Sequence, residues 1–187
     1  LDKIAEFIIH TLSAKRVLLF GGSAGGFASL YYSRQIKKSL ALIWNPQTIL
    51  NNYYKHLVSR YSYLAYDCSL QNLSKHMVTN IPEFYKKVHG NNRIIYMQNV
   101  SDHHVETHLK PFLQIIGRDV PKNEYSQWID ENLYLHISNW SEGHTPPPRK
   151  TLQQLLEKFC QPSFEWTSEN IALAMAEAEA SANTAKN

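Results

Sequence analysis

The sequence predicts an α/β fold, in which an open, mostly parallel sheet is flanked by helices and carries a helical, lid-like insertion. Short apolar runs with the composition of buried strands alternate with stretches of helical periodicity. The 187 residues are 43% hydrophobic, which is enough to bury one sizeable core. We therefore expect one domain over residues 1–165, followed by an Ala/Glu-rich tail over residues 166–187.

The first elements form a strand, helix, strand unit. Apolar residues recur at helical spacing through the first twelve positions, which predicts an amphipathic helix. Residues 16–20 are an apolar run ending in glycines, a pattern typical of a parallel strand buried on both faces. A helix is expected from residue 24 to about 38, and residues 40–44 form a second apolar run, which Asn45 and Pro46 close.

A polar and aromatic segment, residues 48–89, follows the second strand. We interpret it as a helical insertion that forms a cap over the strand ends. Its tyrosines are expected to line the inner face of the cap: Tyr53, Tyr54, Tyr61, Tyr63, Tyr66 and Tyr85.

Two more strands are predicted in the second half, at residues 93–98 and 132–137. A helical stretch begins at Asp102 between them, and Pro111 is expected to kink it. A loop after the last strand leads to a final amphipathic helix that contains Leu152, Leu155, Leu156 and Phe159. The composition of the tail leaves open a frayed helix or disorder.

Composition excludes several classes of function. The 19 basic and 16 acidic residues are interspersed, so the chain lacks the basic block of a nucleic-acid-binding surface. Cys68 and Cys160 have no zinc-binding or redox spacing, which favours a reducing compartment, and the cytoplasm is the expected location. No apolar run approaches the roughly 20 residues that span a bilayer.

One short motif predicts a catalytic residue. Residues 21–25, Gly-Gly-Ser-Ala-Gly, fit G-x-S-x-G, with an apolar strand before them and a helical pattern after them. A serine at such a turn must hold a strained backbone, and Gly25 and Gly26 are expected to let a substrate approach Ser23 Oγ. The Ala24 N–H would then point at the substrate oxygen as half of an oxyanion hole.

Two competing glycine motifs do not fit. A dinucleotide fingerprint needs glycine at position 23, and a phosphate-binding P-loop needs lysine at position 27, which is Phe27 here.

The order of the polar residues resembles that of the α/β-hydrolase superfamily over about residues 1–160. Asp102 and His144 each follow a predicted strand, in the chain order Ser, Asp, His. This resemblance implies that Ser23 is the nucleophile, that His144 is the general base and acid, and that Asp102 fixes the imidazole tautomer.

Each assignment has an alternative. Asp102 could serve only as a helix N-cap, with Asp119 or Asp130 as the carboxylate. His136 is the second choice for the base. His104 and His108 are spaced to share one helical face, but they do not form the H-E-x-x-H zinc motif, and we expect neither a metal nor another cofactor.

The expected activity is cleavage of a carboxylic ester through an acyl-enzyme, with a small molecule or a glycan ester as substrate. The alternatives are an acyl or acetyl hydrolase or transferase acting on a surface polysaccharide, and a hydrolase-like binding or assembly protein without catalysis.

The hydrolase resemblance also predicts that this chain is part of a longer enzyme. In that superfamily the second oxyanion donor comes from a loop after an earlier strand, yet only one helix precedes residue 16. We expect the short chain to turn over slowly, because it lacks that donor, and to be poorly soluble, because its first strand would lack a partner.

Overall fold

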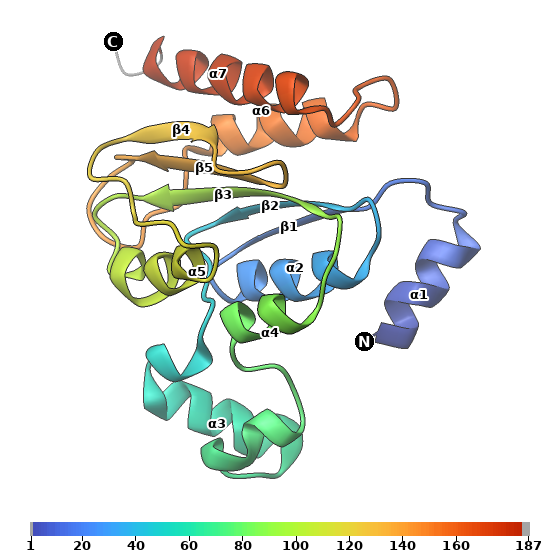
Figure 1. Ribbon diagram of the computed structural model, residues 1–187, viewed down its shortest axis with the longest axis vertical. Helices are drawn as coiled ribbons and strands as arrows, with labels where there is room; N and C mark the ends of the chain where they lie inside the picture. Colours follow the sequence, from blue (N-terminus) through green and yellow to red (C-terminus); the bar gives the residue numbers. More distant parts are fainter. Residues whose placement is uncertain (1, 185–187) are drawn as a thin grey trace.

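Five strands form one open sheet in the order β1-β2-β3-β5-β4 (Figure 1). The computed structural model describes residues 2–184. The strands are β1 (Leu18–Gly22), β2 (Leu40–Trp44), β3 (Arg93–Asn99), β4 (Tyr125–Trp128) and β5 (Leu133–Ser138). The pairs β1–β2, β2–β3 and β3–β5 are parallel, and β4 pairs antiparallel with β5. The predicted fold class is confirmed.

Helices cover both faces of this sheet (Figure 1). One face carries α2 (Ala24–Gln35), α4 (Ile81–Lys87), a π-helical turn η3 (Val105–Leu109) and α5 (Lys110–Gln114). The other face carries α6 (Arg149–Cys160) and α7 (Ser168–Thr184). Successive side chains of β2 and β3 alternate between two separate apolar clusters, one under each layer of helices.

The first strand lies at an edge of the sheet and runs two residues further than expected. Its glycines are strand residues, because Gly21 pairs with Ile43 and Gly22 with Trp44. The indole of Trp44 packs directly on Gly22, at a distance that a Cβ there would not allow. Ahead of this strand, α1 (Asp2–Thr11) exposes its apolar side chains Ile4, Phe7 and Ile8.

The short strand β4 was not predicted from the sequence. Its four residues, Tyr-Ser-Gln-Trp, are too few and too polar to form a recognisable pattern. Tertiary contacts stabilise it: Trp128 Nε1 donates to Ser168 O at 3.1 Å, and the guanidinium of Arg93 lies over the Trp128 ring.

Around the predicted kink, the helix changes from π to α geometry at Lys110, next to Pro111. Proline has no N–H to donate to the carbonyl four residues earlier, that of Thr107. This carbonyl accepts a hydrogen bond from Asn52 Nδ2 instead, at 2.7 Å.

The insertion is helical, but smaller than predicted. A single β-bridge between Ile49 and Asn80 closes its base, and it contains η1 (Leu50–Asn52), α3 (Lys55–Tyr66) and η2 (Leu70–Lys75). It extends away from the sheet below α4 (Figure 1). The remainder of the predicted segment, α4, belongs to the main helical layer.

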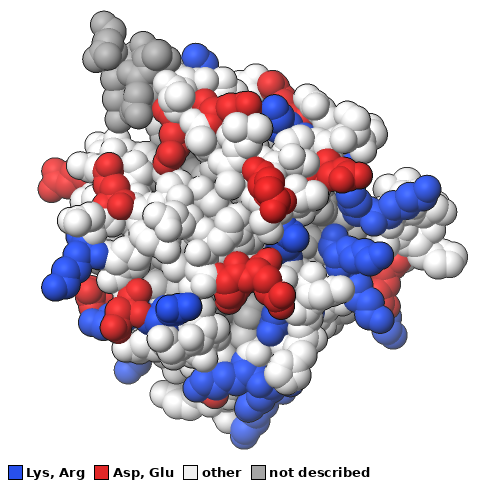
Figure 2. All heavy atoms as spheres, turned by 45° about the horizontal axis from the view of Figure 1, so that its top comes forward, with Lys and Arg blue, Asp and Glu red and all other residues white. Residues whose placement is uncertain are grey.

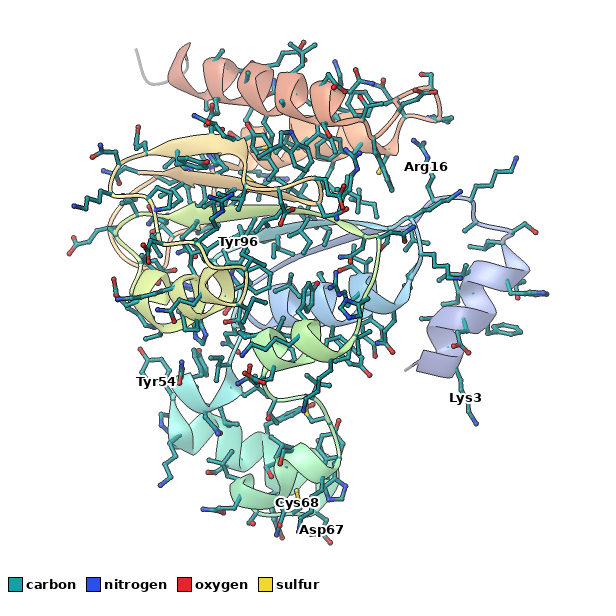
Figure 3. The ribbon with its side chains drawn as sticks, in the orientation of Figure 1. Lys3, Arg16, Tyr54, Asp67, Cys68 and Tyr96 are labelled. Carbon is teal, nitrogen blue, oxygen red and sulfur yellow. The ribbon has the colours of Figure 1, made fainter. Side chains whose placement is uncertain are left out.

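Most tyrosines of the insertion do not line an inner face. Tyr54, Tyr61 and Tyr63 are exposed, and Tyr54 points outward (Figure 3). Tyr85 belongs to the domain core, where its hydroxyl donates to Leu30 O at 2.9 Å. The ring of Tyr53 lies edge-on to that of His104, with 6.4 Å between the centroids.

Of the two alternatives for the tail, residues 168–184 form a helix. Ile171, Ala174, Met175 and Ala178 are buried against the sheet and α6. The Ala-rich composition suits this packing, because small side chains let α7 approach α6 closely.

Neither the charged surface nor the cysteines indicate a binding partner. On the face in Figure 2, basic side chains lie among acidic ones. Cys68 and Cys160 are free thiols. Among the residues described, no helix combines the length and apolar character needed to cross a bilayer.

Candidate active site

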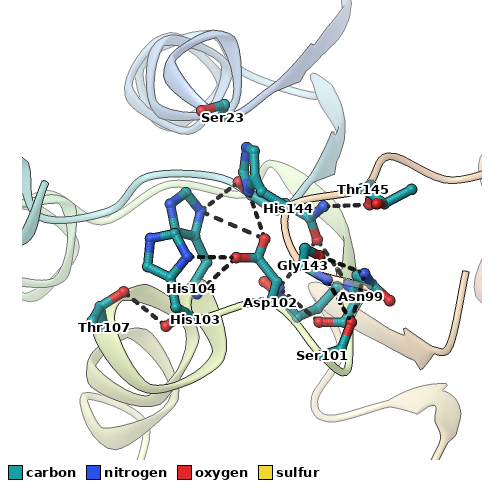
Figure 4. Close-up of polar contacts among 12 residues, drawn as sticks. Ser23, Asn99, Ser101, Asp102, His103, His104, Thr107, Gly143, His144 and Thr145 are labelled. Carbon is teal, nitrogen blue, oxygen red and sulfur yellow. Dashed lines mark hydrogen bonds and ion pairs between the residues drawn. The ribbon is translucent and has the colours of Figure 1, made fainter. Parts of the chain in front are cut away.

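The three predicted site residues lie at one edge of the sheet. Ser23 directly follows β1, Asp102 comes three residues after β3, and His144 lies in the loop after β5. Because these strands are parallel, their carboxyl ends meet at the same edge. In Figure 4 the imidazole of His144 lies between Ser23 and Asp102.

Ser23 has the strained backbone that the motif predicts. Its φ of 51° and ψ of −118° lie outside the regions that side-chain-bearing residues normally adopt. Its carbonyl oxygen accepts the N–H groups of Phe27 and Gln47, and its own N–H donates to Trp44 O at 3.2 Å. The start of α2 and the end of β2 thus hold the turn in place from both sides.

The glycines around Ser23 serve packing more than substrate access. A Cβ on Gly21 would lie 2.5 Å from the backbone carbon of Gly25, so only glycine lets the turn close. Gly26, which we expected to admit the substrate, is buried against Pro46, and a Cβ there would lie 2.5 Å from Pro46 Cβ. At Gly25 a Cβ would meet open space.

Asp102 and His144 form a close pair. His144 Nδ1 lies 2.6 Å from Asp102 Oδ2; the Asp102 side chain is fully buried, whereas that of His144 is 40% exposed. An imidazole that donates from Nδ1 to a carboxylate leaves Nε2 unprotonated in its neutral form, which is the tautomer a general base needs.

Asp102 also makes the contact expected of a helix cap. Its Oδ1 accepts the His104 N–H at 3.0 Å and lies 3.2 Å from His103 Nδ1. Burial alone would raise the pKa of Asp102, but the hydrogen bonds from His144 and the His104 backbone outweigh it and lower the pKa. The carboxylate therefore stays ionised beside His144.

The nucleophile and base are not hydrogen-bonded to each other in this structure. Ser23 Oγ instead accepts a long hydrogen bond, 3.4 Å, from Gln47 Nε2. Catalytic contacts of this kind are often loose without substrate and tighten when the substrate binds.

Ala24 is the first residue of α2. The first four N–H groups of a helix have no acceptor within it, and the helix dipole places partial positive charge there. The Ala24 N–H is thus suited to stabilise negative charge that develops near Ser23 Oγ.

A polar network that was not predicted from the sequence holds the loop of His144. Asn99 Nδ2 donates to the carbonyls of Ser141 and Gly143, both at 2.7 Å. The Ser101 hydroxyl donates to Ser141 O at 2.7 Å and accepts the Gly143 N–H at 3.0 Å.

Asn45, directly after β2, joins this network. Its Nδ2 donates to Thr145 O at 2.8 Å, and its Oδ1 accepts the Asn99 N–H at 2.7 Å. The only sequence signal for Asn45 was the turn that closes β2. Together, Asn45, Asn99 and Ser101 fix the backbone on both sides of His144.

The rival residues lie elsewhere. Asp130 Oδ1 accepts the N–H groups of Asn132 and Leu133 in the turn before β5, at the opposite end of that strand, and Asp119 is exposed. His136 is buried on the face covered by α6 and α7, where Nδ1 lies 2.8 Å from Glu179 Oε1. None of the three is placed to replace Asp102 or His144.

Two buried histidines, His104 and His108, pack beside the pair with ring centroids 4.4 Å apart. His104 Nδ1 lies 2.9 Å from Asn45 O, to which it can only donate, so its lone pair is on Nε2. His108 Nδ1 accepts the Thr48 N–H at 3.1 Å, so a neutral His108 carries its proton on Nε2. Because a metal ligand needs a lone pair, this tautomer argues against a zinc site shared by the two rings.

A different set, Asp102, His104 and His144, offers ligand atoms within 4.8 Å of one another. An ion bound there would take either Nδ1 of His144, which donates to Asp102, or Nε2, which a general base needs. Metal binding and the general-base role of His144 would therefore exclude each other.

We predict that His108 makes the fold sensitive to acid. Burial lowers its pKa from 6.5 to about 3, so between these values the unfolded chain binds the extra proton and the free energy of unfolding falls as the pH falls. His108→Asn keeps an acceptor for the Thr48 N–H but does not titrate. The unfolding free energy of this variant, measured with denaturant from pH 4 to 7, should depend less steeply on pH than that of the wild type, by up to about 1.4 kcal/mol per pH unit. Parallel curves for the two proteins would contradict this prediction.

Comparison with known proteins gives no match: no protein-family model, curated protein or solved structure is significantly similar to this chain.

Proposed function

We propose that this protein is a serine hydrolase of the α/β-hydrolase type that cleaves a carboxylic ester through an acyl-enzyme. One observation carries the proposal: a strained serine at a strand-to-helix turn shares a sheet edge with a 2.6 Å histidine–carboxylate pair. Strain of this kind persists only where the surrounding structure enforces it, and it concentrates at functional sites.

Each residue then has one role. Ser23 Oγ bonds to the carbonyl carbon while His144 Nε2 takes its proton, and the carbonyl π electrons move to the oxygen beside the Ala24 N–H. When the intermediate collapses, the carbonyl re-forms, the bond to the alkoxide breaks, and His144 returns the proton to the leaving oxygen. Water repeats the sequence and releases the acid. Asp102 keeps Nδ1 of His144 protonated throughout.

A glycan ester is the second candidate substrate. One aromatic ring favours it: that of Tyr53 lies edge-on to His104, with 6.4 Å between the ring centroids. Aromatic faces suit sugar rings. Release of acetate from an acetylated polysaccharide, measured beside hydrolysis of a short-chain aryl ester, separates this substrate from a small ester.

Covalent labelling tests the proposal. After incubation with a fluorophosphonate, the intact mass should increase by one adduct, and Ser23→Ala should remove this adduct. Ser69→Ala, at an exposed serine of the insertion, is the matched control and should label like the wild type. An unlabelled wild-type protein would favour the alternative of a non-catalytic binding or assembly protein.

A further inference from the structure

The side chain of Gln47 lies against the nucleophile. Its Nε2 is 3.4 Å from Ser23 Oγ, and its backbone N–H donates to Ser23 O at 3.0 Å. The residue is buried, with 5% of its surface exposed. A polar side chain is thus held inside the site, in contact with the atom that would attack the substrate.

The loop that carries Gln47 is fixed on both sides. Before it, Asn45 donates to Thr145 O, and Pro46 packs on Gly26. After it, Thr48 binds His108 twice: its N–H donates to Nδ1 and its hydroxyl donates to the His108 carbonyl at 2.8 Å. The backbone that carries the amide is therefore held in place before substrate arrives, and a preorganised hydrogen-bond donor stabilises developing charge most effectively.

We propose that Gln47 is a catalytic residue that supplies the second oxyanion donor, beside the Ala24 N–H. The oxyanion forms on the carbon that bonds to Ser23 Oγ, so a donor in contact with Oγ is within reach of it. When Oγ turns toward His144 to give up its proton, it leaves Gln47, and the Nε2 hydrogen becomes available to the oxyanion. The amide donates a hydrogen bond and transfers no proton.

This inference rests on the proposed hydrolase function, and kinetics of near-isosteric variants test it. Gln47→Met keeps the length of the side chain but removes the donor, and Gln47→Glu puts a negative charge in its place. We expect Gln47→Met to lower kcat by about 10² to 10³ with KM changed only a few-fold, and Gln47→Glu to lose more. Binding of an aryl boronic acid, which forms a tetrahedral adduct with serine, should weaken by a similar factor.

Gln35→Met, at an exposed glutamine of α2, is the matched control and should keep wild-type kcat and boronic acid binding. Thermal unfolding of each variant separates the two possible roles. A Gln47→Met protein with a lower Tm and a raised KM, but with boronic acid affinity in proportion to KM, would show that Gln47 only braces the turn.

Fluorophosphonate labelling separates the two proposals. If the wild-type protein labels at Ser23 but Gln47→Met keeps wild-type kcat, the role of Gln47 is wrong and the hydrolase function stands. If the wild-type protein neither labels nor turns over ester, both are wrong.

Discussion

Ser23→Ala should abolish ester hydrolysis while the protein remains folded. Alanine fits the turn but has no nucleophile, and removing the nucleophile of a serine hydrolase costs roughly 10⁶ in kcat. The measurement is kcat for a short-chain aryl ester, together with Tm. A loss of only two-fold would mean that the measured esterase activity belonged to a contaminant.

A glycine at position 23 separates the loss of the nucleophile from the relief of backbone strain. Ser23→Gly should be as inactive as Ser23→Ala. Its free energy of unfolding should be higher than that of Ser23→Ala by about 1 kcal/mol, because glycine adopts a φ of 51° without the steric strain that a Cβ causes. Denaturant unfolding measures this difference. Equal stability of the two variants would show that the turn stores no strain.

Asp102→Asn should lower kcat by roughly 10³ to 10⁴ without loss of the fold. The amide would donate to His144 Nδ1, so the neutral imidazole would carry its proton on Nε2, where it cannot accept the serine proton. We expect kcat/KM of this variant to stay low across the pH range in which the wild type is active. An unaffected Asp102→Asn would show that this carboxylate is only the cap of the following helix.

Combined variants test whether Ser23, Asp102 and His144 act together. His144→Ala and Asp102→Asn, each joined to Ser23→Ala, should add little to the loss caused by Ser23→Ala alone, because the three groups act as one unit. If the losses in kcat/KM of the single variants multiplied in the double variants, the residues would have separate roles. Asp119→Asn is a matched control for Asp102→Asn. Because Asp119 is exposed, this variant should keep full activity.

The sequence by itself predicted the order of the central strands and the helices between them, and it proposed three site residues that the structure brings to one edge of the sheet. Apolar runs and helical periodicity are local patterns, so they located the central strands β2, β3 and β5 to within one or two residues. Its motif pointed to Ser23, and their places after strands pointed to Asp102 and His144, as candidate site residues. These are properties of short segments and of chain order, which sequence analysis can read directly.

Only the tertiary structure decided how the site is held together. The hydrogen bond from Asn45 to Thr145 joins residues 100 positions apart, and that from Asn99 to Gly143 joins residues 44 apart. The contact between Gln47 and Ser23 likewise arises because β1 and β2 pair in parallel, bringing their carboxyl ends together. β4 exists because β5 and α7 pack against it, and α7 is ordered because the sheet and α6 bury one of its faces. No local pattern encodes these contacts, since each depends on the register of strands that are distant in the sequence.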